Sequence, residues 1–566
     1  MKQYSQERQS GLGPVRDTVE SIWVAIMLAL VLRAFMVEAF VIPTGSMAPR
    51  LMGEHWDLRC PQCGYEYAFG LPREAAQHFS RSRKLTPTGA TCPNCGHPYP
   101  YTARPAYVNG GDRVLVLKYI YSFKDPRPWD VVVFRNPQNN RENYIKRLIG
   151  MPGETIEIVH GNIFFKAEGD SAWQIREKPL RAQREMWQIL YDNDYHPSGD
   201  VGEDRSERWR QPRWRVVEGA EECWDLAGFE GRRFAFHGGP GPGRIAFQAP
   251  KGAFLPHYGY NLPRAENSVI DAEVDICSDL KLSSTFVPKE PRGRVTLMLT
   301  SFEHEFQAEL HTDGTAFLRC KSPDGTGGKW VEWGRRRLAK PLQVDRGYAL
   351  ALTHVDLRVT FEIDGEPVLV STRRQYSADY DSLKKRLAEL PDRPIPTPRI
   401  AIETDGGRCE LWHVRLLRDV YYTCPTLGDV SNGVQGHYAR RLRRLGLLDV
   451  RKGMTGWGTT DNPIALARHA DRPDLDEFFV LGDNSPQSLD GRAWTSAAPS
   501  LRLWQKNGRI LRTYENGAKP LYQLGTVPRY NMIGRALLVY WPSGFRLPGL
   551  PGLPLLPNVG KMRLVR

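Results

Sequence analysis

One apolar run near the N-terminus constrains this chain more than any other feature. Residues 21–32 carry no charge, and the apolar character continues to Pro43 with only Arg33 and Glu38 interrupting it. A membrane span needs about 20 apolar residues, so a span here has to recruit flanking residues, and Arg33 can extend its side chain to the membrane interface. The run therefore predicts a transmembrane anchor over residues 15–36.

The alternative reading of this run is a cleaved secretory signal peptide. No convincing A-x-A cleavage site follows it, which favours an uncleaved anchor. Lys2, Arg8 and Arg16 precede the run, and Lys and Arg mark the cytoplasmic side of a span. We therefore expect a single-pass protein of the cell membrane with a cytoplasmic N-terminus. The remaining chain would lie on the outer side, periplasmic or extracellular.

Length and composition bound the rest of the chain. The 566 residues are 41% apolar and 25% charged, which indicates several folded domains and excludes a mainly disordered chain. The formal net charge is +13. Spread over so many residues, this surplus is weak support for nucleic-acid binding, and we expect no nucleic acid partner.

Two polar residues stand in apolar surroundings that make them candidates for chemistry. Ser46 follows an alternating apolar strand and a Pro-Thr-Gly turn in EAFVIPTGSMAP. Lys146 lies in NYIKRLIGMPGETI, after the β-branched run VVVFRNP. This lysine either points to solvent from an edge strand or is held inside, where desolvation lowers a lysine pKa. A neutral lysine can act as the general base for a serine.

A third segment, FFVLGDNSPQSLDGR, places Ser488, Asp490 and Arg492 at a spacing of two after an apolar strand and a turn. Together with GDRVLVLKY and IGRALLVYWP, these motifs resemble, in order, those of the bacterial type I signal peptidases, membrane-anchored Ser/Lys proteases. The matching segments are a minority of the chain. Arg50 stands where the family most often has Thr, and Gly491 where Ser is common.

The resemblance implies a role for each matching residue. Ser46 would be the nucleophile and Lys146 its general base, while the Ser46 backbone N–H and the Thr44 hydroxyl would hold the oxyanion. Ser488 would hydrogen-bond to Lys146 and orient it. Supporting roles fall to Asp490 and Arg492 as an ion pair, and to Asp483 and Arg147; substrate contacts fall to Val41, Ile42 and Met47.

The implied reaction removes signal peptides from exported preproteins that carry small residues at the first and third positions before the cut. The substrate would add as an extended strand. Catalysis would need no cofactor, and the active site would lie at the lipid surface. A catalytically inactive frame that binds ligands through an inserted domain is the alternative function. A self-cleaving repressor-type protease is disfavoured by the span and by the lack of a DNA-binding module.

Two C-x-x-C-G knuckles lie between Ser46 and Lys146. Cys60 and Cys63 form the first, and Cys92 and Cys95 form the second. Paired knuckles of this kind aim four thiolates at one tetrahedral zinc ion, which predicts a structural zinc ribbon. Two disulfides are the alternative, because an outer compartment can be oxidising.

A large insertion between Lys146 and Ser488 reads as many short alternating strands. Asp-Gly pairs at 313–314 and 364–365 are typical of hairpin turns and favour an antiparallel β-sandwich. The run of strands resembles concanavalin-like (laminin-G-like) jelly rolls. Such a module could bind a glycan or a protein, or serve only as a spacer.

The sequence thus predicts a mainly β protein with two insertions in a signal-peptidase-type core. A basic helical pattern at 437–450 is either solvated or a contact for anionic lipid. The expected division is: cytoplasmic segment 1–14; anchor 15–36; core 37–59; zinc ribbon 60–104; core 105–166; β-sandwich 167–422; partly helical connection 423–476; core 477–494; second insertion 495–526; closing strand and tail 527–566.

Overall fold

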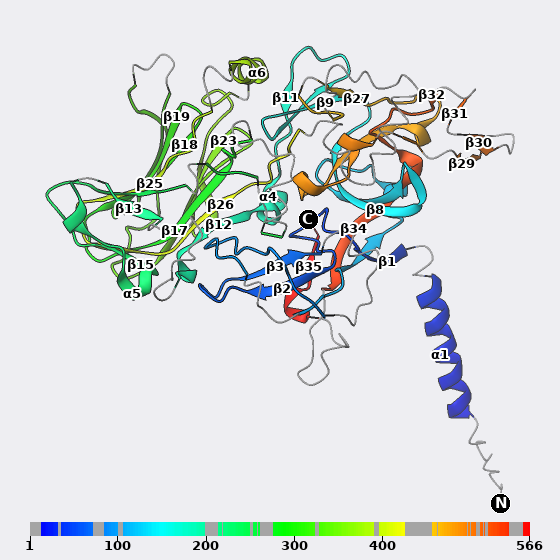
Figure 1. The fold of residues 1–566 in the computed structure, drawn as a ribbon, viewed down its shortest axis with the longest axis horizontal. Coiled ribbons are helices and arrows are strands. Elements are labelled where there is room, and N and C mark those ends of the chain that lie inside the picture. The colour runs from blue at the N-terminus through cyan, green and yellow to red at the C-terminus, as the bar shows by residue number, and fades with distance from the viewer. Residues whose placement is uncertain are drawn as a thin grey trace, which may run out of the picture.

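The computed structural model of the chain is mainly β, and Figure 1 shows its arrangement. The predicted helix at 437–450 lies outside the residues that the structure describes. These are residues 13–31, 36–71, 84–99, 106–197, 213–217, 219–249, 253–256, 259–260, 275–322, 328–377, 379–389, 395–424, 456–460, 462–494, 496–497, 500–504, 510–512, 514–515, 519–542 and 558–565.

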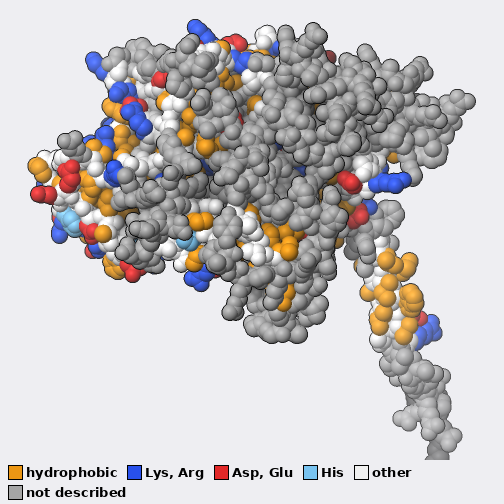
Figure 2. Space-filling model, viewed as in Figure 1, with side chains coloured by type: hydrophobic (Ala, Val, Ile, Leu, Met, Phe, Trp, Pro, Cys, Tyr) orange, Lys and Arg blue, Asp and Glu red, His pale blue; other side chains and the backbone are white. Residues whose placement is uncertain are grey.

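Helix α1 (Gly13–Val31) carries part of the expected anchor and stands away from the rest of the molecule (Figure 1). Apolar side chains such as Trp23 and Val24 are exposed along it, as Figure 2 also shows. Its first half contains Arg16, Asp17 and Glu20. Within the described ranges, no helix combines the length and apolar character that crossing a membrane requires.

The sheet that holds the candidate catalytic segments gathers strands from distant parts of the sequence. Its order is β1-β6-β34-β7-β8-β28-β33, with β35 added to β34, and every pairing is antiparallel. In β6, inward residues such as Val114 and Val116 alternate with more exposed ones, as expected where one face packs on a core. The strands are β1 (Val37–Val41), β6 (Arg113–Leu117), β7 (Val131–Asn136), β8 (Asn139–Gly150), β28 (Glu477–Leu481), β33 (Val527–Pro528), β34 (Met532–Trp541) and β35 (Arg563–Leu564).

Two short antiparallel pairs follow the Ser46 region. The hairpin of β2 (His55–Arg59) and β3 (Glu66–Gly70) carries the first cysteine knuckle at its turn. The second pair is formed by β4 (Lys84–Leu85) and β5 (Ala106–Tyr107). Aromatic rings and the cysteines form a separate small core here, consistent with a unit distinct from the main sheet.

The large insertion contains two antiparallel sheets that share one apolar core, as the alternating strands predicted. Their orders are β14-β15-β26-β17-β22-β23-β24, with β12 on β26, and β13-β16-β25-β18-β19-β20-β21. Both predicted Asp-Gly pairs lie in hairpin turns, with Gly314 and Gly365 at positive φ. The sheets form the green and yellow half of Figure 1.

The sandwich strands are β12 (Gln188–Asp192), β13 (Trp214–Val216), β14 (Trp224–Asp225), β15 (Arg233–Phe236), β16 (Gly243–Phe247), β17 (Leu280–Pro288), β18 (Arg294–Ser301), β19 (His304–His311), β20 (Thr315–Lys321), β21 (Val331–Arg337), β22 (Tyr348–Val355), β23 (Arg358–Ile363), β24 (Glu366–Val370), β25 (Ile400–Asp405) and β26 (Cys409–Arg418).

A small sheet of order β11-β10-β9-β27 joins the two halves, and helix α4 packs beside it. It pairs residues before the sandwich with residues after it, because β27 pairs with β9. Strand β11, which lies in the predicted insertion, pairs with β10, so the first residues of that insertion belong to this small sheet. The elements are β9 (Glu154–Val159), β10 (Asn162–Ala167), β11 (Gln174–Ile175), α4 (Leu180–Met186) and β27 (Ile464–Ala465). Elsewhere lie α3 (Ile120–Phe123), α5 (Gly228–Gly231), α6 (Tyr380–Ala388), β29 (Ser500–Trp504), β30 (Ile510–Arg512), β31 (Tyr514–Glu515) and β32 (Lys519–Pro520).

Candidate active site

Ser46 lies in a tight turn just beyond strand β1. Asn484 holds this turn through two hydrogen bonds. Its backbone N–H donates to the Ser46 carbonyl (3.1 Å), and its side-chain amide donates to the Gly45 carbonyl (2.9 Å). Asn484 follows strand β28, so a segment far along the chain fixes the turn. These two hydrogen bonds hold the backbone that positions the Ser46 hydroxyl.

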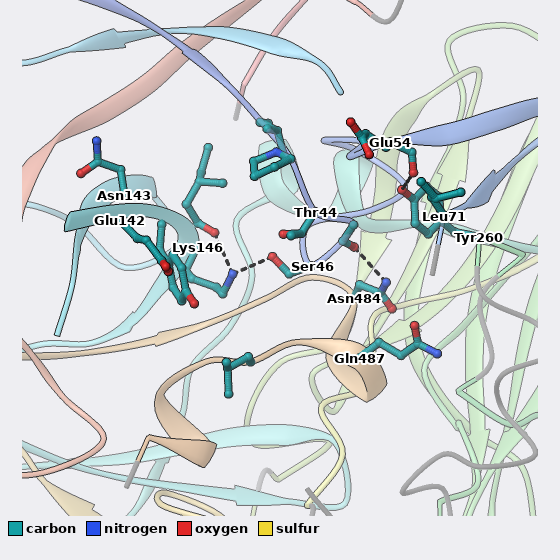
Figure 3. Close-up of a pocket in the computed structure, with 16 residues that line it drawn as sticks. Thr44, Ser46, Glu54, Leu71, Glu142, Asn143, Lys146, Tyr260, Asn484 and Gln487 are labelled. Carbon is teal, nitrogen blue, oxygen red and sulfur yellow. Dashed lines mark hydrogen bonds between the residues drawn. The ribbon is translucent and has the colours of Figure 1, made fainter. Parts of the chain in front are cut away.

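Lys146 meets Ser46 from strand β8 (Figure 3). Its side chain is 3% exposed, and its Nζ donates to the Ser46 Oγ at 2.6 Å and to the Ile145 carbonyl at 3.1 Å. Lys146 pairs with Val132 of β7 and opens a stretch of β8, residues 146–150, that is buried on both faces. Of the two orientations that the sequence left open, the structure shows the buried one.

Ser488 differs from the expectation. The Ser488 Oγ is buried and, among the described residues, has no hydrogen-bond partner, so the predicted bond to Lys146 is not made. The hydroxyl instead faces Gly482: a Cβ on that glycine would lie 2.1 Å from the Ser488 Oγ and 2.5 Å from the Ser46 carbonyl oxygen. Ser488 thus lies close to the Ser46 turn but does not orient the lysine in this arrangement.

Asp490 and Arg492 form a buried bidentate ion pair, with Nε–Oδ1 at 2.9 Å and Nη2–Oδ2 at 2.7 Å. Asp490 also accepts the Gly482 N–H, and Arg492 donates to the Ser485 hydroxyl and carbonyl. Burial alone would lower the pKa of the Arg492 guanidinium, but the charge of Asp490 raises it. The pair therefore fixes residues 482–485, which in turn hold the Ser46 turn.

Arg147 and Asp483 form a second buried pair beside the first. Arg147 donates to both carboxylate oxygens of Asp483 at 2.7 and 2.6 Å, and to the Trp129 carbonyl at 3.0 Å. Burial alone would lower the pKa of Arg147, but Asp483 raises it. Charge-assisted bidentate bonds of this kind lock geometry, so strand β8 and the turn after β28 are held in register next to Lys146.

Arg492→Ala should destabilise the fold by about 3–5 kcal/mol, because it leaves the Asp490 carboxylate buried without its partner. Thermal and denaturant unfolding of purified protein measure this loss. The matched control is Arg399→Ala, since Arg399 is 75% exposed in its pair with Glu305 and such pairs contribute about 0–1 kcal/mol. Equal stability of the two variants would contradict the structural role given to Asp490 and Arg492.

A cavity of about 410 Å³ surrounds Ser46 and Lys146. Thr44 and Ile42 line it, and Thr44 is exposed. Val41 and Met47, the other two residues expected to contact substrate, are not among the residues that line it. Val41 points outward at the end of β1 and is 48% exposed, whereas Met47 is 1% exposed and packs in the core.

Several lining residues were not foreseen from the sequence. Glu54 and Leu71 flank the β2–β3 hairpin, and Tyr260 comes from the large insertion. No motif marks these positions, and only the folded chain brings them to Ser46. The other lining residues not foreseen are Pro43, Gly45, Glu142, Asn143, Tyr144, Ile145, Asn484, Gln487 and Leu489.

The four knuckle cysteines form one cluster, with all their Sγ atoms within 4.8 Å of one another. Cys60 Sγ lies 3.5 Å from Cys95 Sγ, and Cys63 Sγ lies 3.7 Å from Cys92 Sγ. Four sulfurs at about 2.3 Å from a tetrahedral zinc ion lie about 3.8 Å apart. The donor set and spacing fit zinc, and all four thiols are free rather than disulfide-bonded.

Comparisons with known proteins agree with the motifs. The family model described as "Signal peptidase, peptidase S26" matches residues 101–203. The chain is 23% identical over 149 residues to signal peptidase I of Rickettsia bellii, covering 26% of this chain and 39% of the relative. It is 40% identical over 97 residues to signal peptidase I of Buchnera aphidicola, covering 15% of this chain and 30% of the relative.

The chain thus spans about two fifths of the Rickettsia relative's length. These similarities support a hydrolase of the signal peptidase kind. Among solved structures, the chain is similar to the carbohydrate-binding module CBM66 from Bacillus subtilis, at 14% identity and a TM-score of 0.23, covering 37% of this chain and 96% of that one. That score is too low to assign a fold or a ligand to the sandwich.

Proposed function

We propose that the protein is a membrane-anchored serine endopeptidase of the signal peptidase I type, which removes N-terminal signal peptides from exported preproteins. The observation that carries this proposal is the contact of 2.6 Å between the buried Lys146 Nζ and the Ser46 Oγ. A serine beside a base within hydrogen-bond reach has the geometry of an activated nucleophile. Their place in one cavity leaves room for a peptide bond.

In the proposed mechanism Lys146 acts in its neutral form and takes the proton of the Ser46 hydroxyl as the oxygen attacks the scissile carbonyl. The C–N bond then breaks, Lys146 returns the proton to the leaving amine, and an acyl-enzyme remains on Ser46. Water, deprotonated by Lys146, hydrolyses this ester. The Ser46 N–H and the Thr44 hydroxyl would hold the oxyanion, and such donors typically contribute about 10²–10³-fold each.

Two strands beside the cavity support binding of an extended substrate. Strand β1 pairs only with β6 among the described strands. On β8, strand β28 pairs with Arg147, Leu148 and Gly150, and the part of β8 that precedes these pairings lines the cavity. A peptide that lies between these strands gains backbone hydrogen bonds, and its residues before the cut would pass Ile42 and Ile145.

Attachment to the cell membrane is part of the proposal. The apolar side chains of α1 lie exposed, away from the folded body, and α1 is the element that precedes strand β1 in the sequence. Burial of these side chains in lipid would remove them from water. Ser46 would then lie near the outer surface of the cell membrane, where signal peptides emerge.

A structural zinc ion in the cysteine cluster completes the proposal. Cys60, Cys63, Cys92 and Cys95 would supply all four ligands and leave no position for a reacting water. The ion would stabilise the β2–β3 hairpin, whose flanking residues reach the cavity. Catalysis itself would need no cofactor.

Cleavage of a synthetic preprotein by the detergent-solubilised full chain tests this function. The substrate carries small residues at the first and third positions before the cut, and sequencing of the product's N-terminus locates the cleaved bond. Wild type should cut there and Ser46→Ala should not. No cleavage by a well-folded wild type, or equal cleavage by both, would overturn the proposal and direct attention to the sandwich as a binding module.

A further inference from the structure

The side chain of Tyr260, a residue of the large insertion, lies against the candidate active site. It belongs to the segment between β16 and β17, far along the chain from Ser46. Nevertheless it lines the same cavity as Ser46 and Lys146, and it is only 6% exposed. Figure 3 shows Tyr260 with Leu71 and Glu54 on the side of Ser46 away from Lys146.

Two glycines make room for the Tyr260 ring. A Cβ on Gly45, the residue before Ser46, would lie 2.3 Å from the ring's Cε1, and a Cβ on Gly70 would lie 2.0 Å from it. Real side-chain atoms do not approach so closely, so the ring is in direct contact with both backbones. Any larger residue at either position would have to displace it.

Hydrogen bonds fix the ring in this place. The Tyr260 hydroxyl donates to the Glu54 carbonyl at 3.0 Å, and the Tyr260 carbonyl accepts the Gly70 N–H at 2.7 Å. The Leu71 N–H in turn donates to the Glu54 carbonyl at 2.9 Å. Tyr260 is therefore a rigid part of the cavity wall, built jointly by the insertion and the β2–β3 hairpin.

We propose that Tyr260 determines specificity by limiting the size of the substrate residue that follows the scissile bond. This inference rests on the proposed function. If the substrate residues before the cut lie along β1, the substrate continues past Ser46 toward Tyr260, on the side away from Lys146. The fixed ring then leaves space for a small side chain and excludes a bulky one.

Two synthetic preproteins that differ only in the residue after the cut, alanine or tryptophan, test this role. Wild type should prefer alanine by about 10-fold or more in kcat/KM, because a misfit in a pocket typically costs about 10–200-fold. Tyr260→Ala should remove most of this preference by accelerating the tryptophan substrate. Tyr260→Phe is the matched control; it keeps the ring, so it should keep the preference.

Each outcome separates this inference from the proposed function. If wild type cleaves in a Ser46-dependent manner but Tyr260→Ala retains the wild-type ratio, the inference is wrong and the function stands. If wild type cleaves neither preprotein, the proposed function fails and the inference fails with it. Should Tyr260→Ala melt well below wild type, Tyr260→Leu provides the same comparison, since leucine fills part of the space without an aromatic ring.

Discussion

Replacing Lys146 with methionine should lower preprotein cleavage by at least about 10³-fold, because it removes the only amine that contacts the Ser46 hydroxyl among the described residues. Methionine keeps most of the side-chain volume, so the buried site should not collapse. Single-turnover cleavage assays measure the loss, and thermal unfolding checks that the variant is folded.

A control variant and a double variant test whether the loss of cleavage is specific to the pair of Ser46 and Lys146. Lys340→Met removes an exposed lysine on the sandwich and should leave cleavage unchanged. The double variant Ser46→Ala with Lys146→Met should be no slower than either single one, since residues that act as a unit are not additive. If Lys146→Met cleaves at a rate within about 10-fold of wild type, Lys146 is not the general base.

Purified protein should contain one zinc ion per chain, and Cys92→Ser should lose it together with most of the cleavage activity. Zinc binding to such sites is coupled to folding, with apparent free energies of about 10–16 kcal/mol. Loss of the ion should disorder the β2–β3 hairpin, whose neighbours Glu54 and Leu71 line the cavity. Metal analysis and a chelator titration followed by unfolding measure both effects.

Cys223→Ser is the matched control for the zinc experiment, because Cys223 lies outside the cluster and is only half-buried. It should retain zinc and activity. If wild type instead contains no metal and its mass rises by two hydrogen atoms per cysteine pair on reduction, the knuckles form disulfides, as the alternative interpretation expects.

Much of the fold followed from local patterns in the sequence. Alternating residues and the Asp-Gly turns predicted the paired sheets of the insertion, because period and turn chemistry are local properties. The spacing of the two cysteine knuckles predicted a cluster that the structure shows. By contrast, no local pattern predicts that β27 pairs with β9, since that contact closes a loop around the entire sandwich.

The candidate active site was likewise predicted only in part. The motifs pointed to Ser46 and Lys146, and the structure brings them together. Met47, expected at the cleft, packs in the core, because a sequence does not show which face of a turn is buried. Tyr260 could not be predicted, because only the fold brings it against Gly45.

Capture of the acyl-enzyme tests the central claim most directly. A preprotein reaction quenched during turnover and analysed by peptide mass spectrometry should show the signal-peptide fragment esterified to Ser46, and Ser46→Ala should show no adduct. An adduct on another residue, or cleavage that continues in Ser46→Ala, would contradict a Ser46 nucleophile activated by Lys146.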